Sequence, residues 1–122
     1  LFNTLYYSHG VINPFSSLFM DALFLDRPII VPAFDPKPVP YWESVRRIEE
    51  FTHLKPVMES ASVKIAWTPE ELKKHLYWYA EDRKRDAKER TFLMEQECFS
   101  RDGRSSERLL EVLSRANVDA NL

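Results

Sequence analysis

This chain of 122 residues has only two glycines, Gly10 and Gly103, and one cysteine, Cys98. So little glycine excludes both a phosphate loop of the G-x-x-x-x-G-K-S/T type and the G-x-S-x-G turn that exposes a hydrolase serine. A single cysteine cannot form an internal disulfide, which fits a reducing cytoplasm. We expect Cys98 to be a buried structural thiol.

The sequence also lacks an excess of either charge and a long apolar run. Its formal net charge is -2, which gives no basic field for a nucleic-acid backbone. No apolar stretch approaches the roughly 20 residues of a membrane span, and no signal sequence is visible. We therefore expect one soluble cytoplasmic domain that does not bind nucleic acid. Peripheral contact with the inner face of the membrane stays open.

The histidines do not form a metal site. His9, His53 and His75 are far apart, and zinc needs three or four convergent ligands. The expectation is no bound metal and no cofactor. Only His9, just before a predicted strand, is kept as a candidate ligand-binding histidine.

The first third of the chain predicts a strand, a helix and a strand. An opening helix is stopped by Gly10 and followed by a β-branched strand at 11–13, a helix at 16–25 and a strand at 29–31 that Pro32 ends. Short joins between such elements predict parallel strands with a right-handed crossover. The fold class is therefore α/β, with a Rossmann-like parallel sheet flanked by helices.

The remaining elements follow from proline, capping residues and helical spacing. Thr68, Pro69 and Glu71 form the start of a helix, with a capping box. The mixed charges of 81–90 predict a solvated helix face. In order, we expect a proline-rich loop at 34–43, a helix at 42–51, a strand at 62–67 and a helix that starts at 69. The helix from 69 should point Leu72, Leu76 and Tyr79 inward. Two more helices follow, one with Ala87, Thr91, Met94 and Cys98 on one face and a last one with Leu109, Val112 and Leu113 available for packing.

The helix predicted at 16–25 carries the most informative polar residues. Ser16 and Ser17 stand at its start, where free N–H groups and the helix dipole favour an anion. On residue type alone, a serine that simply caps the helix is the more usual interpretation. Asp21 is misplaced for a capping box but shares a face with Ser17. Its apolar neighbours predict a mostly buried helix, in which a carboxylate needs a partner. A ribose diol and an arginine, either Arg27 or Arg46, are equally good partners on these grounds.

The segment 13–31, NPFSSLFMDALFLDRPIIV, resembles the nucleotide-binding segment of GT-B glycosyltransferases and of their relatives, the CDP-glycerol glycerophosphotransferases. The shared features are the paired serines, the acid on the following helix, and a proline seven residues after that acid, as from Asp21 to Pro28. The segment 102–113 also resembles the "DG" and "ER" tail of these enzymes. One departure is that Asn13 and Asp21 replace the two glutamates of the E-x7-E pattern of many sugar transferases.

The resemblance implies that residues 1–122 are the C-terminal, donor-nucleotide-binding half of a GT-B enzyme whose N-terminal acceptor domain is absent. It implies that Ser16 and Ser17 contact the donor diphosphate and that Asp21 accepts hydrogen bonds from the ribose hydroxyls. The turn from Asn13 to Phe15 would line the same pocket. The implied activity is that of a metal-independent glycosyltransferase or glycerophosphotransferase of surface or capsular polysaccharide synthesis.

The implied partners are a nucleotide-activated sugar or alditol and a glycan or lipid-linked acceptor. The catalytic base is expected on the absent half, so this chain alone should bind the donor without turnover. Two alternatives are kept. One is an enzyme like the UDP-sugar 2-epimerases. The other is a non-catalytic α/β interaction module, in which Ser16 caps the helix and Asp21 pairs with Arg27 or Arg46.

Overall fold

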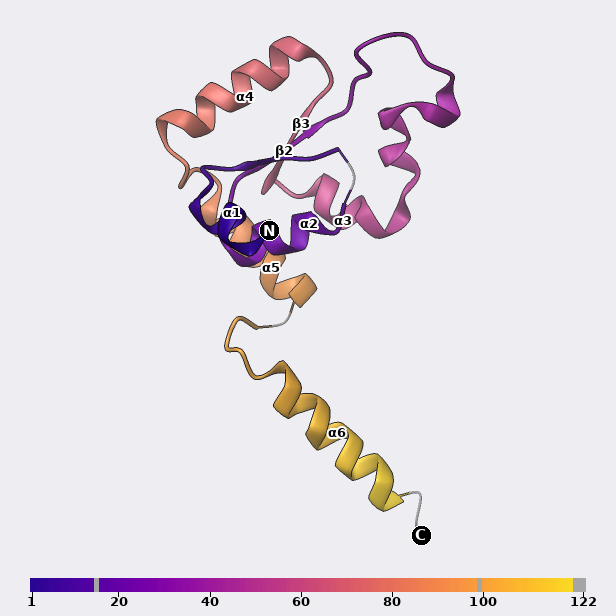
Figure 1. Cartoon of the computed structure of the whole chain (residues 1–122), viewed down its shortest axis with the longest axis vertical. Helices are drawn as coiled ribbons and strands as arrows, with labels where there is room; N and C mark the ends of the chain where they lie inside the picture. The colour runs from indigo at the N-terminus through magenta and orange to yellow at the C-terminus, as the bar shows by residue number, and fades with distance from the viewer. Residues whose placement is uncertain (15, 99, 120–122) are drawn as a thin grey trace.

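A parallel sheet of three strands forms the centre of the protein (Figure 1). The computed structural model describes residues 1–14, 16–98 and 100–119. The strands are β1 (Val11–Ile12), β2 (Ile29–Pro32) and β3 (Val63–Ala66), in the order β1-β2-β3. Val11 pairs with Ile29, and Ile29 pairs with Val63, both in parallel register. The predicted α/β class, the Rossmann-like parallel sheet and the strand-helix-strand unit are confirmed.

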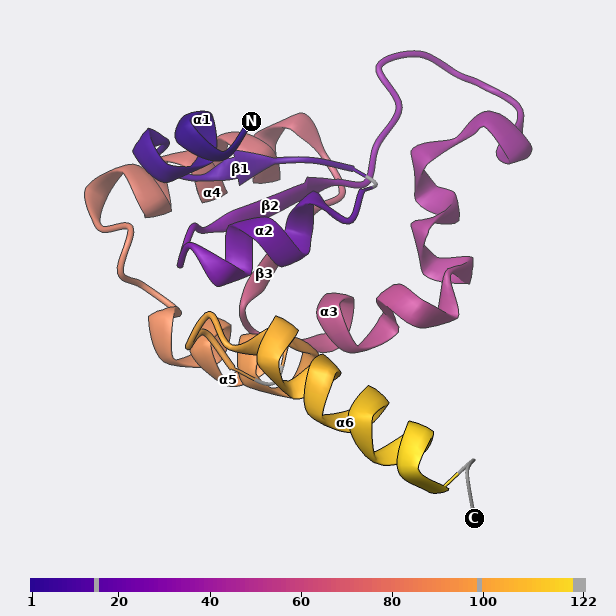
Figure 2. The ribbon, with the colours of Figure 1, turned by 60° about the horizontal axis from the view of Figure 1, so that its bottom comes forward.

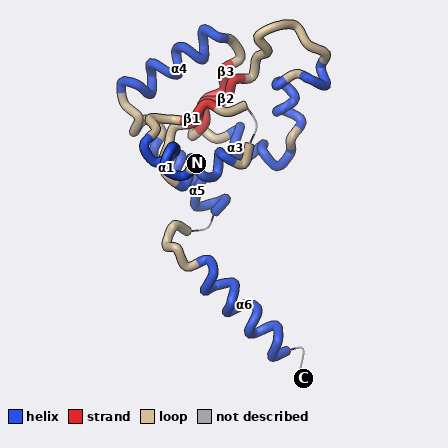
Figure 3. The backbone as a smooth tube through the Cα atoms, in the orientation of Figure 1, coloured by secondary structure: helices blue, strands red, loops and turns tan. Residues whose placement is uncertain are grey.

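Helices and a proline-rich connection account for most of the other residues (Figure 3). Among the residues that the structure describes, no helix has both the length and the apolar character needed to cross a membrane. The segment predicted as a helix at 42–51 forms 3₁₀ helices, which suits the three-residue spacing of its apolar positions. The elements are α1 (Phe2–Tyr7), α2 (Leu18–Phe24), the 3₁₀ helices η1 (Tyr41–Glu43), η2 (Val45–Glu50) and η3 (Thr52–Leu54), α3 (Lys55–Glu59), α4 (Pro69–Glu81), α5 (Ala87–Cys98) and α6 (Ser105–Asp119).

The helices cover both faces of the sheet (Figure 2). Side chains alternate along β2, so Ile30 packs toward α4 and its buried Tyr79. Ile29 and Val31 join the larger core on the other face, together with Leu23 of α2 and Leu93 of α5. These four aliphatic side chains are at most 5% exposed. Helix α2 is thus fixed from one side by the sheet and from the other by α5.

Gly10 has a different role from the predicted helix stop. Helix α1 ends before it, and Ser8 occupies the C-cap position in an extended conformation. A Cβ atom on Gly10 would lie 3.1 Å from the carbonyl oxygen of Pro28. Glycine therefore permits the close approach of the two backbones where β1 begins to pair with β2.

The start of α4 confirms the predicted capping residues. The Glu71 N–H donates to Thr68 Oγ1 at 3.1 Å. The Glu71 carboxylate accepts from the N–H of Trp67, at 2.6 Å, one residue earlier than in a standard capping box. The capping pair therefore also fixes the chain as it leaves β3.

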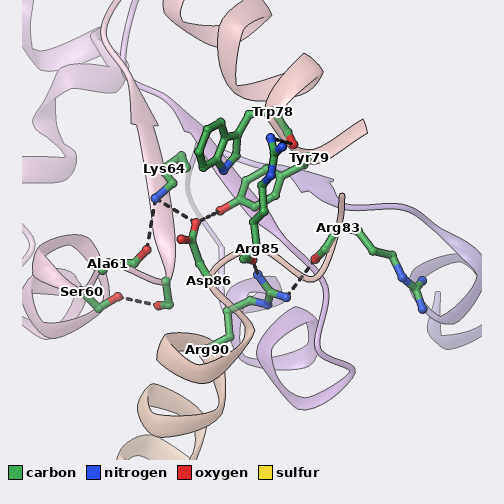
Figure 4. A network of polar contacts seen from close by, with 10 residues as sticks. Ser60, Ala61, Lys64, Trp78, Tyr79, Arg83, Arg85, Asp86 and Arg90 are labelled. Carbon is green, nitrogen blue, oxygen red and sulfur yellow. Dashed lines mark hydrogen bonds and ion pairs between the residues drawn. The ribbon is translucent and has the colours of Figure 1, made fainter. Parts of the chain in front are cut away.

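A buried arginine joins α5 to the rest of the molecule (Figure 4). The Arg90 side chain is completely buried. Its Nε donates to Asp26 Oδ1 at 2.9 Å, and its terminal nitrogens donate to the carbonyl oxygens of Arg85 and Arg83 at 2.7 and 3.1 Å. The prediction that 81–90 is only a solvated helix face is wrong, because one of its arginines is an internal hydrogen-bond donor.

Asp86 is the second centre of this network, and it adopts a left-handed backbone conformation with φ 59°. Its Oδ2 accepts from Lys64 Nζ of β3 and from the Tyr79 hydroxyl of α4, each at 2.8 Å. Partial burial raises the pKa of Asp86, but the hydrogen bonds from Lys64 and Tyr79 outweigh burial, so the net pKa is lowered. The carboxylate therefore stays ionised and connects two elements.

Three expectations about packing are corrected by the burial of individual side chains. Leu76 is exposed on α4, whereas Tyr79 is buried as predicted. On α5 the buried residues are Arg90, Leu93 and Met94, while Thr91 is exposed and Cys98 is only half-buried. Helix α6 extends away from the body in Figure 1, and its apolar side chains are exposed. These exposed side chains are Leu109, Leu110, Val112 and Leu113.

Candidate functional site

A cavity of about 480 Å³ lies beside the paired serines. It forms where the chain leaves the carboxyl ends of β1 and β2, the edge at which open parallel sheets bind ligands. Its volume falls in the range of roughly 300–1,000 Å³ that is usual for small-molecule sites. The lining residues are Ser16, Ser17, Met20, Trp42, Ser44, Arg47, Phe51, Leu54, Val57 and Glu97.

The two serines have different local roles. Ser16 Oγ accepts a hydrogen bond from the N–H of Leu18 at 3.1 Å, so Ser16 helps to start α2. Ser17 stands at the N-cap position but makes no side-chain capping bond. Both line the cavity. Capping thus accounts for the Ser16 hydroxyl and leaves that of Ser17 unexplained.

Asp21 lies in the first turn of α2 and is exposed. Most of α2 is buried or half-buried, as predicted, but the inference that its carboxylate is buried and needs a partner is wrong. Phe19, Ala22 and Leu23 form the buried face, whereas Asp21 and Phe24 face outward. Asp21 does not line the cavity at Ser17. Its carboxylate acts on Cys98 of α5, where it helps to raise the pKa of the thiol after the larger effects of burial and Glu97.

Arg27 is not the partner of Asp21 that one alternative required. Its Nε donates to the carbonyl oxygen of Leu5 at 3.1 Å, and its Nη2 donates to that of Tyr6 at 2.5 Å. Arg27 therefore fixes the end of α1. Within the described part of the chain, Asp21 makes no ion pair with Arg27 or Arg46.

The turn before the serines is only partly described. The Asn13 N–H donates to the Ile30 carbonyl oxygen at 3.1 Å and extends the pairing of β1 with β2. Asn13 is half-buried and does not line the cavity. Phe15 lies outside the described residues. The predicted roles of Asn13, Phe15, Ser16, Ser17 and Asp21 in binding a donor stay predictions.

Most of the other residues that line this cavity were not predicted from the sequence. Trp42, Arg47 and Phe51 come from the 3₁₀ segment, and Glu97 comes from the end of α5. The one sequence signal for these residues was a tryptophan in a proline-rich stretch that we expected to be a loop. These residues are mainly apolar, with Arg47 and Glu97 as the charged members.

His9 belongs to a different part of the molecule. It lines a separate cavity of about 320 Å³, between the free edge of β1 and α4, with Gly10 and Leu76 among its neighbours. In the ranges that the structure describes, no group of three or more histidine, cysteine, aspartate or glutamate residues is placed to hold a metal ion.

Three comparisons with known proteins bear on the identity of the chain. The family model for CDP-Glycerol:Poly(glycerophosphate) glycerophosphotransferase matches residues 3–115. No curated protein and no solved structure matches the chain in the other two comparisons. The match includes the paired serines, the whole sheet and most of α6. The chain therefore belongs to the CDP-glycerol:poly(glycerophosphate) glycerophosphotransferase family, which is a family of transferases.

Proposed function

We propose that this chain binds the nucleoside diphosphate part of an activated donor, as the donor-binding portion of a GT-B glycerophosphotransferase. The observation that carries the proposal is the position of Ser16 and Ser17. They line a cavity at the carboxyl edge of a parallel sheet and precede a helix. That edge is the usual ligand site of such sheets. The family match supports the proposal, because this is a family of transferases that use a nucleotide-activated donor.

In this proposal the serine turn holds the diphosphate. Hydroxyl donors at Ser16 and Ser17 would stabilise the negative charge that develops on the departing nucleotide phosphate. The N–H groups of Leu18, Phe19 and Met20 already donate to Ser16 and Ser17, so the hydroxyls are the main donors in this scheme. Because α2 packs against the sheet and α5, the Ser17 hydroxyl at its start would need little reorganisation during the reaction. A divalent metal is not required in this scheme.

Asp21 would accept hydrogen bonds from the ribose hydroxyls. Its exposure supports this role, because a carboxylate with no ion pair in the described part of the chain can receive a ligand without first losing a partner. Because Asp21 lies outside the cavity, the nucleoside would lie along the outer face of α2. The acceptor, a glycan or a lipid-linked chain, would approach from the side of the catalytic base, in surface polysaccharide synthesis at the cytoplasmic face of a membrane.

Replacing Ser17 by alanine tests the diphosphate role. We expect a loss of about tenfold or more in the affinity for cytidine or uridine diphosphate, because a hydrogen bond to a charged group contributes roughly 1.5–3 kcal/mol. Isothermal titration calorimetry on the purified chain measures it. Ser17 makes no capping bond, so the fold should be unchanged. Ser106→Ala on α6 is the matched control. Equal affinity of Ser17→Ala and wild type, or no nucleotide binding at all, would contradict the proposal.

Asp21→Ala separates the ribose from the diphosphate. We expect it to abolish measurable binding of the nucleoside diphosphates and to leave the binding of inorganic pyrophosphate unchanged, because pyrophosphate has no diol for the carboxylate to contact. The same calorimetric titration, with each of the two ligands, makes the comparison. If Asp21→Ala bound nucleotides as wild type does, the assignment of Asp21 to the ribose would be wrong.

A further inference from the structure

Trp42 is an exposed tryptophan held in a fixed turn. It is 69% exposed, and it lines the cavity at the serines. Arg47 Nη1 donates to its carbonyl oxygen at 2.9 Å. Arg47 Nε donates to Glu50 at 3.2 Å, and the Tyr41 hydroxyl donates to the other oxygen of Glu50 at 2.6 Å. These three bonds form a chain that returns to the turn carrying Trp42.

A second set of bonds fixes the base of the same turn. Asp35 accepts from the Ser44 hydroxyl at 2.5 Å and from the Val45 N–H at 3.1 Å. The bonds from Ser44 and Val45 lower the pKa of Asp35, so the carboxylate stays ionised. Fixing an exposed tryptophan has no evident value for the core. The bonds fix the backbone that carries the indole, which restricts where the indole can lie and so lowers the entropy that is lost when a ligand binds.

The order of parts in a donor determines what reaches Trp42. A donor is linear, with the nucleoside at one end, the diphosphate in the middle and a sugar or an alditol at the other end. If Asp21 takes the ribose and the serines take the diphosphate, the nucleoside lies outside the cavity. The cavity beyond the serines then receives the sugar or alditol unit.

The chemistry of the other residues that line the cavity suits a sugar or an alditol. The indole of Trp42 offers a flat apolar face for the C–H groups of a polyol, and burial of that contact is favourable. Arg47 and Glu97 are the charged groups that line the same cavity and can bond to hydroxyls. In the described residues, Arg47 Nη2 makes no hydrogen bond, so it retains donors for a ligand.

We propose that Trp42 is the platform on which the sugar or alditol unit of the donor lies. Arg47 fixes this platform and bonds to the hydroxyls of the unit. The inference rests on the proposed function, because it uses the serine turn as the diphosphate site. It adds a specificity-determining residue that discriminates between the complete donor and the bare nucleotide.

The test compares two ligands on Trp42→Ala by isothermal titration calorimetry. The ligands are a cytidine diphosphate that carries glycerol and cytidine diphosphate alone. We expect Trp42→Ala to lower the affinity for the glycerol-bearing donor by about fivefold or more, from the apolar area that one stacked face removes from water. The affinity for cytidine diphosphate should not change. Ser17→Ala should lower both affinities.

Trp78→Ala is the matched control, since Trp78 is 44% exposed and is covered by the Arg85 guanidinium, 4.0 Å from the ring centre. It should change neither affinity. If Trp42→Ala weakened both ligands equally, the cavity would hold the base and the inference would be overturned. The inference would also be overturned if Trp42→Ala weakened the binding of neither ligand while Ser17→Ala weakened the binding of both. If Ser17→Ala affected neither ligand, the proposed function itself would fail.

Discussion

Replacing Arg90 by methionine is expected to lower the free energy of unfolding by about 2–4 kcal/mol, because two carbonyl oxygens lose their donor and each buried acceptor left unsatisfied costs roughly 1–3 kcal/mol. Arg90 is completely buried and donates to Asp26 and to two backbone carbonyl oxygens. Methionine fills a similar volume but donates to none of them. Urea unfolding followed by circular dichroism measures the loss.

The chain offers a matched control for this substitution. Arg83 has an exposed side chain that points away from the network in Figure 4, and only its carbonyl oxygen takes part. Arg83→Met should therefore change the stability by no more than about 0.5 kcal/mol. Arg90→Lys should be intermediate, because lysine keeps the charge but lacks the planar fork of donors. A stable Arg90→Met protein would show that the network is dispensable.

Replacing Leu23 by alanine should cost about 2–5 kcal/mol, from lost apolar burial and from the cavity that remains. Leu23 is completely buried on the face of α2 that packs against the sheet and α5. The same substitution at Leu110, which is 66% exposed on α6, should cost no more than about 0.5 kcal/mol. Thermal and urea unfolding of the two variants give the comparison.

The contrast between these leucines tests the placement of α6 as well as the core. An equally large loss at Leu110 would mean that α6 packs against the body, contrary to the structure. A small loss at Leu23 would mean that α2 is held mainly by its polar bonds. Because α2 follows the serine turn, the Leu23→Ala protein should also lose affinity for nucleoside diphosphates in proportion to its unfolded fraction.

The elements that the sequence predicts well are those with local signals. Thr68 with Glu71 starts α4, because capping residues act on their immediate neighbours. The predicted end of β2 at residue 31 is one residue too early, since Pro32 still pairs with Ala66. The β-branched residues of β1 and β2 with a short helix between them were enough for the parallel unit. Paired serines at the end of β1 then predicted one wall of the cavity.

The errors concern residues whose environment depends on distant contacts. Arg90 belongs to a run of mixed charges, but it shares a face with Leu93 and Met94, and its carboxylate partner Asp26 lies far back in the chain. Asp21 has apolar neighbours on both sides, yet only one face of α2 is covered. The remaining lining of the cavity comes largely from the segment that we predicted as one helix at 42–51, and the spacing of its apolar residues gave no sign that Trp42 lines a site.

The parallel pairing of the strands has a consequence for the order in which the protein folds. Val11 meets Ile29 after one short helix, whereas Ile29 meets Val63 only after the whole proline-rich connection has been closed into a loop. Closing the longer loop costs more chain entropy before any contact compensates for it. The serine turn lies within the first closure and Trp42 within the second. We therefore expect the serine turn to form before the segment that carries Trp42.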